Sequence, residues 1–415
     1  MSRRTPPILE SRAEPLGTAF DLLAAYRPPG VFFERRGIGA AGWIGAARLT
    51  FGSEDLADLS DVVELLRTAV TGRDASPVAA GAIAFGGDRG PHELVVPRRS
   101  VRRDLDGRTW RVDTNLAGGP DEAPPPFDRV AGGAPHEPFR DVQITEIPTS
   151  DGYERAVASA VDAVRETELR KVVLARTVEV DAGRTLDPRA LVHRLRAVDP
   201  DAYTFAAPTD DGVIVGASPE LLVSRHGREV RSNPLAGSAS RSGDRDEDRA
   251  SAEALAASSK DREEHVIVVE AVAEVLGPFC EDLRWDLEPV LRGTPNVWHL
   301  STSFEGVLRD PPPSSLDLVA ALHPTPAVAG TPIEAALATI DQLEPFSRGR
   351  YAGPVGWVDA NGDGDWAIAL RCAELVGDRA TLYAGAGIVA GSDPEAELAE
   401  TERKFQAFLD ALRWG

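Results

Sequence analysis

Hydrophobic and polar positions after residue 150 alternate in patterns typical of β-strands. Residues 171–180 (KVVLARTVEV) are a mostly apolar run that predicts a strand, with Lys171 at its start. Residues 203–232 alternate and turn at Asp-Gly and His-Gly, which predicts antiparallel hairpins. Residues 353–391 are expected to form three strands joined by two Gly/Asp turns.

Helical spacing recurs between these strands. We expect a short helix near residues 56–70, one continuous helix over residues 251–277 and a terminal helix over residues 394–414. Since most strands would pair with sequence neighbours, the pattern predicts an α+β fold with large antiparallel sheets, and not a βαβ repeat.

A Pro/Gly-rich stretch, residues 117–138, divides the chain. We therefore expect an N-terminal lobe segment, residues 1–145, and a catalytic region, residues 146–415, within one integrated two-lobed unit. Residues 78–87 predict a buried strand, but the N-terminal part carries no motif with recognisable chemistry.

Composition indicates a cytoplasmic globular protein. Hydrophobic residues make up 42% of the 415 residues and charged residues 27%, which suffices for a core. Only two cysteines are present, Cys280 and Cys372, so a disulfide framework is excluded and a reducing compartment is expected. No signal peptide is evident at the N-terminus, and no apolar run approaches the roughly 18 residues of a membrane span.

The charge pattern narrows the class of ligand. A formal net charge of −21 disfavours nucleic-acid binding, and an anionic substrate would need a locally basic pocket. Of the 45 basic residues only three are lysines, namely Lys171, Lys260 and Lys404. Because lysine, unlike arginine, can act as a base when buried, these three positions are candidates for function.

Two predicted helices carry acidic residues that could bind a metal. Glu397, Glu400 and Lys404 share one face of the terminal helix, and Asp261 and Glu264 lie on the helix before it. Two carboxylates from separate helices, with water and a substrate oxygen, are typical of a magnesium site. Solvated charged faces are the alternative.

Further candidates lie in loops and turns. Glu220, in SPELL, stands among apolar neighbours that would raise its pKa, as a general acid requires, although a solvent-facing loop position is the alternative. His323 lies in a Pro-rich loop, and the glycines of residues 384–391 would let the backbone approach a carboxylate. The histidines show no zinc-ligand spacing.

Taken in order, ten segments resemble the chorismate-utilising enzymes, the family that includes anthranilate, aminodeoxychorismate, isochorismate and salicylate synthases. The resemblance covers about residues 150–412. The segments are KVVLAR, GASPELL, NPLAGSASR, SKDREEH, HLSTSFEG, LHPTPAVAG, YAGPVGW, ALRCAEL, AGAGIV and the final Glu-Thr-x-x-Lys.

The resemblance implies a magnesium-dependent reaction on chorismate. It assigns Glu264 and Glu400 as Mg²⁺ ligands that hold the C1 carboxylate, with Glu397 and Asp261 nearby, some of them through water. It also assigns Lys171 as the base that activates water and Glu220 as the acid that protonates the departing C4 hydroxyl. The implied substrate-binding residues are Ser238, His323, Ala327, Tyr351, Arg371, Gly385, Gly387 and Lys404.

Single positions indicate the branch of the family. Anthranilate synthases resemble this chain but carry glutamine in place of Lys171, and aminodeoxychorismate synthases carry a lysine nucleophile where Ala236 stands. Water is therefore the expected nucleophile, and no glutaminase subunit is expected.

Two further positions bear on the product. Salicylate synthases resemble this chain here but have the segment HPTPTVAG, with threonine in place of Ala327, so Ala327 favours isochorismate as the product. Tyr351, in contrast, is the residue typical of salicylate synthases. We expect isochorismate formation, with salicylate synthesis or a non-catalytic chorismate-binding subunit as alternatives. The sequence leaves open the oligomeric state, with a monomer as one option, and the pathway, menaquinone or siderophore.

Overall fold

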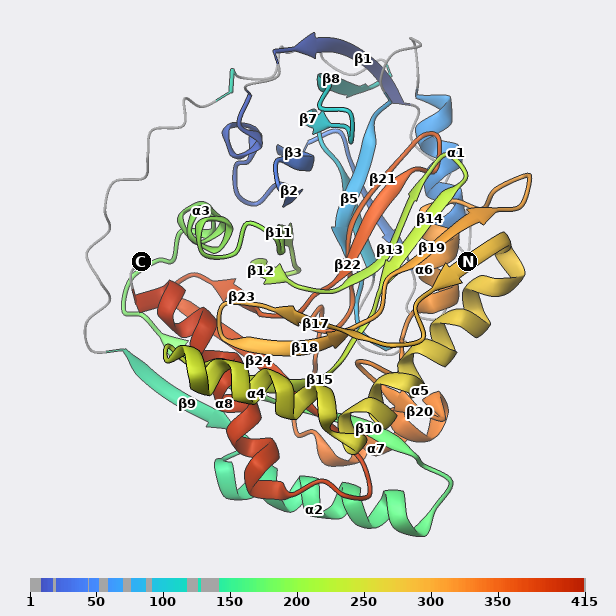
Figure 1. The fold of residues 1–415 in the computed structure, drawn as a ribbon. Helices are drawn as coiled ribbons and strands as arrows, with labels where there is room; N and C mark the ends of the chain where they lie inside the picture. Colours follow the sequence, from blue (N-terminus) through green and yellow to red (C-terminus); the bar gives the residue numbers. More distant parts are fainter. Residues whose placement is uncertain are drawn as a thin grey trace.

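The strands of the computed structural model form antiparallel sheets (Figure 1). It describes residues 9–17, 20–43, 45–51, 59–69, 76–86, 92–117, 126–127 and 142–413. The largest sheet has twelve strands, with β9 (Gln143–Ile147) pairing beside β10. The other strands run, in spatial order, β1 (Leu9–Leu16), β8 (Thr109–Leu116), β7 (Arg99–Arg103), β3 (Ile38–Trp43), β2 (Val31–Arg35), β11 (Tyr203–Pro208), β12 (Val213–Ser218), β23 (Cys372–Val376), β24 (Arg379–Ile388), β10 (Lys171–Asp181) and β20 (Gly330–Thr331).

Two further sheets complete the strand framework. The nine-stranded sheet runs β16 (Cys280–Trp285), β19 (Phe304–Leu308), β14 (Glu229–Asn233), β13 (Leu221–His226), β22 (Gly364–Ile368), β21 (Pro354–Asp359), β5 (Val78–Ala82), β6 (His92–Val96) and β4 (Ala47–Phe51). The three-stranded sheet runs β15 (Leu235–Ser240), β18 (Val297–Ser301) and β17 (Val290–Gly293).

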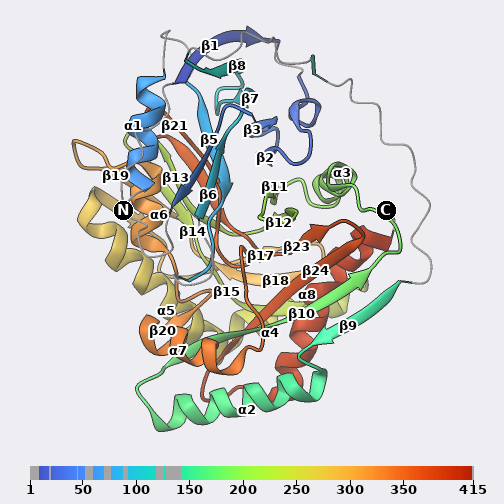
Figure 2. The ribbon, with the colours of Figure 1, turned by 180° about the vertical axis from the view of Figure 1, so that it is seen from behind.

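The helices cover the outer faces of these sheets. They are α1 (Ser60–Thr68), α2 (Ser150–Glu166), α3 (Pro188–Val198), α4 (Arg245–Ala257), α5 (Ser259–Leu276), α6 (Ser315–Leu322), α7 (Ile333–Leu343) and α8 (Pro394–Arg413), with short 3-10 turns η1 (Leu22–Ala25) and η3 (Gly277–Phe279). Helices α2 and α8 lie together against β10 and β24, as both views show (Figure 2). This arrangement of helices and antiparallel sheets confirms the predicted α+β class.

The segment 353–391 forms four strands, so the expectation of three was wrong. The chain leaves the nine-stranded sheet after β22 and enters the twelve-stranded sheet at β23. The break falls at Arg371, whose φ of 49° lies in the left-handed region and turns the chain sharply. The same change of sheet occurs between β12 and β13, at Glu220.

The expected single helix over residues 251–277 is two helices. Ser258 ends α4 and begins α5, with an extended backbone (φ −69°, ψ 115°) and a side chain that accepts a hydrogen bond from the Asp261 N–H. An N-cap serine of this kind satisfies a backbone donor that the helix leaves unpaired. The apolar periodicity continues across the break, which is why the pattern concealed it.

Strands from the N-terminal region lie inside both large sheets. Strand β2 pairs with β11, and β5 pairs with β21. The predicted helix near residues 56–70 is α1, although residues 56–58 and 70 lie outside the described part, as does most of the Pro/Gly-rich stretch. The strand predicted over residues 78–87 is β5, and all five of its residues are buried.

The core consists of two groups of buried side chains. The larger group includes Phe205 and Trp366, and the smaller one includes Phe405 and Phe408 of α8. Within the described residues, no helix combines the length and the apolar character needed to cross a membrane.

Candidate active site

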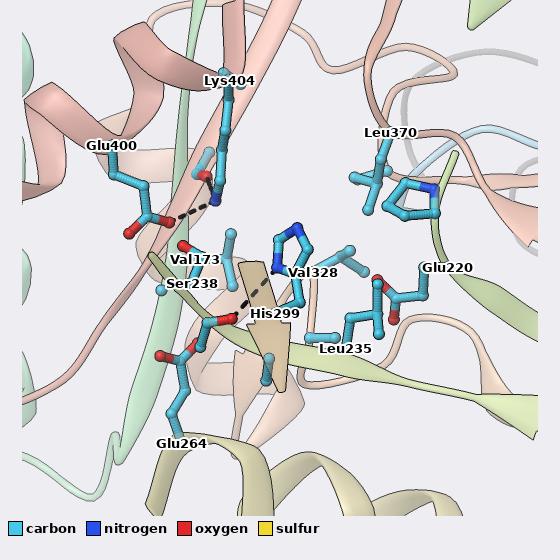
Figure 3. Close-up of a pocket in the computed structure, with 18 of the residues that line it drawn as sticks. Val173, Glu220, Leu235, Ser238, Glu264, His299, Val328, Leu370, Glu400 and Lys404 are labelled. Carbon is cyan, nitrogen blue, oxygen red and sulfur yellow. Dashed lines mark hydrogen bonds and ion pairs between the residues drawn. The ribbon is translucent and has the colours of Figure 1, made fainter. Parts of the chain in front are cut away.

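A pocket opens where the three sheets meet α5 and α8 (Figure 3). Strands β10 and β24 form one wall, and the three-stranded sheet forms another. Glu220 and Arg371, at the two changes of sheet, also line the pocket, as do side chains of α5 and α8. Most residues predicted for the site line this pocket, namely Glu220, Ser238, Asp261, Glu264, Ala327, Tyr351, Arg371, Gly385, Gly387, Glu397, Glu400 and Lys404.

All three lysines of the chain pair with glutamates of this site. The Nζ–Oε1 distances are 3.0 Å for Lys171 with Glu264, 2.8 Å for Lys260 with Glu397, and 2.5 Å for Lys404 with Glu400. The glutamates come from α5 and α8, as the spacing on the two helices predicted.

The acidic residues influence one another's ionisation. Burial raises the pKa of Glu397, and the nearby Glu400 raises it further. Burial also opposes ionisation of Glu400, but Lys404 and a hydrogen bond from Ser238 outweigh it and lower the pKa of Glu400. Burial, together with Glu264 and Glu400, raises the pKa of Asp261. The cluster therefore concentrates negative charge that a cation would relieve.

This donor set fits a hard divalent cation. Carboxylate oxygens from two helices are the ligands that Mg²⁺ prefers. Two glycines let the acidic side chains lie close to the backbone. A Cβ on Gly237 would stand 3.0 Å from Cβ of Asp261, and a Cβ on Gly387 would overlap Oε1 of Glu264. Among the described residues, no three acidic, His or Cys side chains converge as a ligand group, and lysines pair with the glutamates.

Lys171 lies directly behind the pocket wall. It begins β10, is completely buried, and contacts the pocket through its ion pair with Glu264. Beyond that ion pair its Nζ has no hydrogen-bond partner. A buried amine held beside a flexible carboxylate can exchange a proton with a water molecule if that carboxylate turns away.

Glu220 occupies the other side of the pocket. In Figure 3 its carboxyl group lies across His299 from Glu264 and Glu400. It is 4% exposed, and its N–H donates to Oγ of Ser218 at 3.2 Å. Burial raises its pKa to about 7, against smaller opposing effects of the Leu235 N–H and Lys171. A raised pKa of this kind is what a general acid requires.

Cationic side chains face the interior of the pocket. Arg371 donates from Nη2 to Nε2 of His299 at 3.3 Å, so Nδ1 of that ring carries the hydrogen and donates to the Gly237 carbonyl at 3.3 Å. Burial lowers the pKa of His299 to about 3, which keeps the ring neutral. Lys404 donates to the Gly385 carbonyl at 2.8 Å. Arg371 and Lys404 thus provide the local positive charge that an anion requires.

Aromatic side chains close the pocket near Ala327. Tyr351 is 4% exposed and stacks on Tyr383, with ring centroids 5.0 Å apart and planes inclined by 11°. A Cβ on Gly385 would stand 3.1 Å from the Tyr351 hydroxyl, so this glycine allows the tyrosine close to the backbone.

His323 is not brought to the pocket. It follows α6 and is buried, with its ring 5.9 Å from that of Phe85, and burial lowers its pKa to about 3. Its loop instead contributes Ala327 and Val328. Conversely, His299 and Tyr383 line the pocket although the sequence predicted neither as a site residue. His299 lies in the segment HLSTSFEG, which resembles the family, whereas Tyr383 has the pattern of an ordinary strand residue.

Comparisons with known proteins agree on one family. Residues 130–413 match the family described as chorismate binding enzyme. The isochorismate synthase DhbC of Bacillus subtilis is 38% identical over 421 residues, which covers 98% of this chain and 97% of that protein. The isochorismate synthase EntC of Escherichia coli is 42% identical over 272 residues, 65% of this chain and 69% of that protein. The structure of MenF, the menaquinone-specific isochorismate synthase of E. coli, superposes with a TM-score of 0.80 at 27% identity, over 98% of this chain and 95% of that one.

Proposed function

The chain belongs to the chorismate-binding enzyme family, and from this premise we propose that it is an isochorismate synthase. Water adds at C2 of chorismate, the ring double bonds shift, and the C4 hydroxyl leaves as water. One observation carries this proposal. The buried Lys171 lies behind the wall of a pocket that contains cationic side chains, and the protonatable Glu220 lines the same pocket.

Lys171 and Glu220 divide the proton transfers. Lys171 accepts a proton from the attacking water, and Glu220 gives a proton to the departing hydroxyl. Their separation in the pocket, with Glu220 across His299 from Glu264, suits a reaction in which one oxygen arrives while another leaves from a different ring carbon. His299, which lies between Glu220 and Glu264, is neutral and adds no further positive charge there.

The two carboxylates of chorismate would bind the cationic side chains. Arg371 can donate two parallel hydrogen bonds to one carboxylate. Lys404 and the backbone at Gly385 and Gly387 face the other part of the pocket, where the glycines leave room for a ligand.

Glu264 and Glu400 would hold Mg²⁺, with Glu397 and Asp261 close by. When bound, the ion supplies positive charge beside the C1 carboxylate, which this acidic region would otherwise repel. Ser238 donates to Glu400 and keeps that carboxylate oriented toward the pocket.

Product identification tests the proposal. Purified protein is incubated with chorismate and Mg²⁺ near neutral pH, and the products are separated chromatographically. Isochorismate as the main product supports it. Salicylate with pyruvate would instead identify a salicylate synthase, and chorismate binding without turnover would identify a non-catalytic subunit.

A further inference from the structure

Two arginines outside the pocket lining, Arg35 and Arg292, form no ion pair with any described residue. Arg35, at the end of β2, donates from Nη1 to the Tyr203 hydroxyl at 2.9 Å and from Nε to the backbone carbonyl of Asp201 at 2.9 Å. Arg292, on β17, donates to the side-chain carbonyl of Asn233. Among the described residues, no carboxylate oxygen lies within 4.0 Å of either guanidinium.

The three-stranded sheet places Arg292 in line with the pocket. Ser238 pairs with His299 across β15 and β18, and His299 pairs with Arg292 across β18 and β17. Residues directly opposite each other in antiparallel strands project from the same face. Ser238 and His299 line the pocket, and Arg292 continues their row as the half-buried residue of the otherwise exposed edge strand β17.

Arg35 approaches the same region from the other side. Tyr203, its hydrogen-bond partner, pairs with Ser218, which lies two residues before Glu220. Burial lowers the pKa of Arg292, and the nearby charge of Arg35 lowers it further. The charge of Arg292 in turn lowers the pKa of Glu220. The two guanidiniums therefore flank the acid side of the pocket.

Asp199 and Asp201 are the acidic side chains whose charges reach Arg292, but neither forms an ion pair with it, because both carboxylates have other partners. The carboxylate of Asp201 binds Arg36, and the carboxylate of Asp199 accepts the Asp201 N–H at 3.1 Å. Neither guanidinium forms an ion pair within the described part of the chain, so in a protein with a net charge of −21 these two half-buried arginines form a local attraction for an anion.

We propose that Arg35 and Arg292 form an anion-capture site beside the catalytic pocket, which binds a carboxylate of the incoming dianion before it reaches Arg371 and Lys404. The inference rests on the proposed function for the identity of the dianion, chorismate. It explains how such a substrate enters a pocket whose far side carries four acidic side chains.

Steady-state kinetics over a range of salt concentrations test the site. For Arg292→Gln we expect kcat/KM for chorismate to fall about 10-fold at low ionic strength. The difference from the wild type should shrink to within about twofold near 0.5 M salt, where exposed charges are screened. Arg292→Lys, which keeps the charge, should retain most of kcat/KM.

The matched control is Arg231→Gln. Arg231 is an exposed arginine on β14 with the acidic neighbours Glu229 and Glu305 at 3.4 Å and 4.0 Å, so its loss should leave kcat/KM and its salt dependence unchanged. A loss in Arg292→Gln that is equal at all salt concentrations, or that accompanies an equal fall in kcat and a lower Tm, would overturn the capture site in favour of a structural role.

A binding experiment separates this proposal from the proposed function. Chorismate is mixed rapidly with the wild-type protein and with Arg292→Gln, and the association rate constant is followed by protein fluorescence. Salt-sensitive association that Arg292→Gln slows supports the capture site even if the wild type releases no isochorismate. Turnover with equal association rates in both proteins would reject the capture site alone.

Discussion

At the scale of single residues, a substitution of Lys171 can distinguish the effect of its charge from its role in proton transfer. Arginine keeps a positive charge beside Glu264 but cannot deprotonate water. We therefore expect Lys171→Arg to lose turnover by about 10²–10⁴-fold, while chorismate binding measured by calorimetry changes little. An unchanged melting temperature would show that the larger side chain fits, and normal turnover would place the base elsewhere.

Glu220 sets the expected dependence on pH. Its pKa is about 7, above the usual carboxyl value because of burial, and the reaction needs its protonated form. The value of kcat/KM should therefore decline as pH rises through about 7, since this ratio reports the free enzyme. A pH profile of initial rates checks this, and an alkaline limb that begins only above pH 9 would contradict the role of Glu220.

Ala327 bears on product choice. It lines the same pocket as Tyr351 and offers no hydroxyl. A threonine there could form one more hydrogen bond, worth about 0.5–1.5 kcal/mol, to the region that elimination of pyruvate depends on. Ala327→Thr should raise the fraction of salicylate in the product mixture, as chromatography would reveal. An Ala327→Val control adds bulk without the hydroxyl and should not raise it.

Residue types with a distinctive chemistry were predictable from the sequence. The scarcity of lysine in an arginine-rich chain marked three lysines as candidates for function, and all three form ion pairs with glutamates of the pocket. Histidines gave no such guidance. His323 and His299 are equally plausible in the sequence, and only the packing of β18 beside β15 brings His299 into the site while α6 carries His323 against Phe85.

At the scale of elements, strands and helices were predictable but their interruptions were not. Ser258 and Arg371 break segments whose apolar pattern continues on both sides. In each case the break is favoured by tertiary contacts, since Arg371 lies in the pocket between two sheets and Asp261, in the first turn of α5, lies beside Gly237. Local periodicity contains no record of such contacts.

The close contact of β24 with β10 leads to an element-scale prediction. A methyl group on Gly387 would overlap Oε1 of Glu264 and stand 3.1 Å from Cε of Lys171. Since displacement of a reacting group by about 1 Å can cost about 100-fold, Gly387→Ala should lose activity to about that extent. Gly391→Ala is the matched control, because nothing lies within 4 Å of its added carbon. Equal activity of the two variants would show that the site adapts to the methyl group.

At the scale of the whole molecule, net charge makes the cation requirement testable. Five acidic side chains line a pocket within a chain of net charge −21, and four of them come from α5 and α8, so excess EDTA should abolish activity and added Mg²⁺ should restore it. Glu264→Gln and Glu400→Gln should each raise the Mg²⁺ concentration needed for half activity. Full activity in excess EDTA would refute the metal assignment.

The α+β class was predictable, whereas the order of strands in the sheets was not. The segment before residue 145 carries no motif, yet its strands lie between later ones, with β5 beside β21 and β2 beside β11. Such pairings join residues far apart in sequence, and neither alternation nor turn chemistry in the N-terminal region specifies the partner.

The place of β5 inside the nine-stranded sheet also governs how the chain acquires its structure during synthesis. Ala82 pairs with Val355, so one edge of β5 has no partner until most of the chain has left the ribosome, a delay on the order of tens of seconds. Sheets closed by such distant pairings form slowly. Meanwhile the apolar segment VAAGA presents an open edge on which other nascent chains can pair. We therefore expect shielding of this edge before β21 emerges to raise the yield of folded protein.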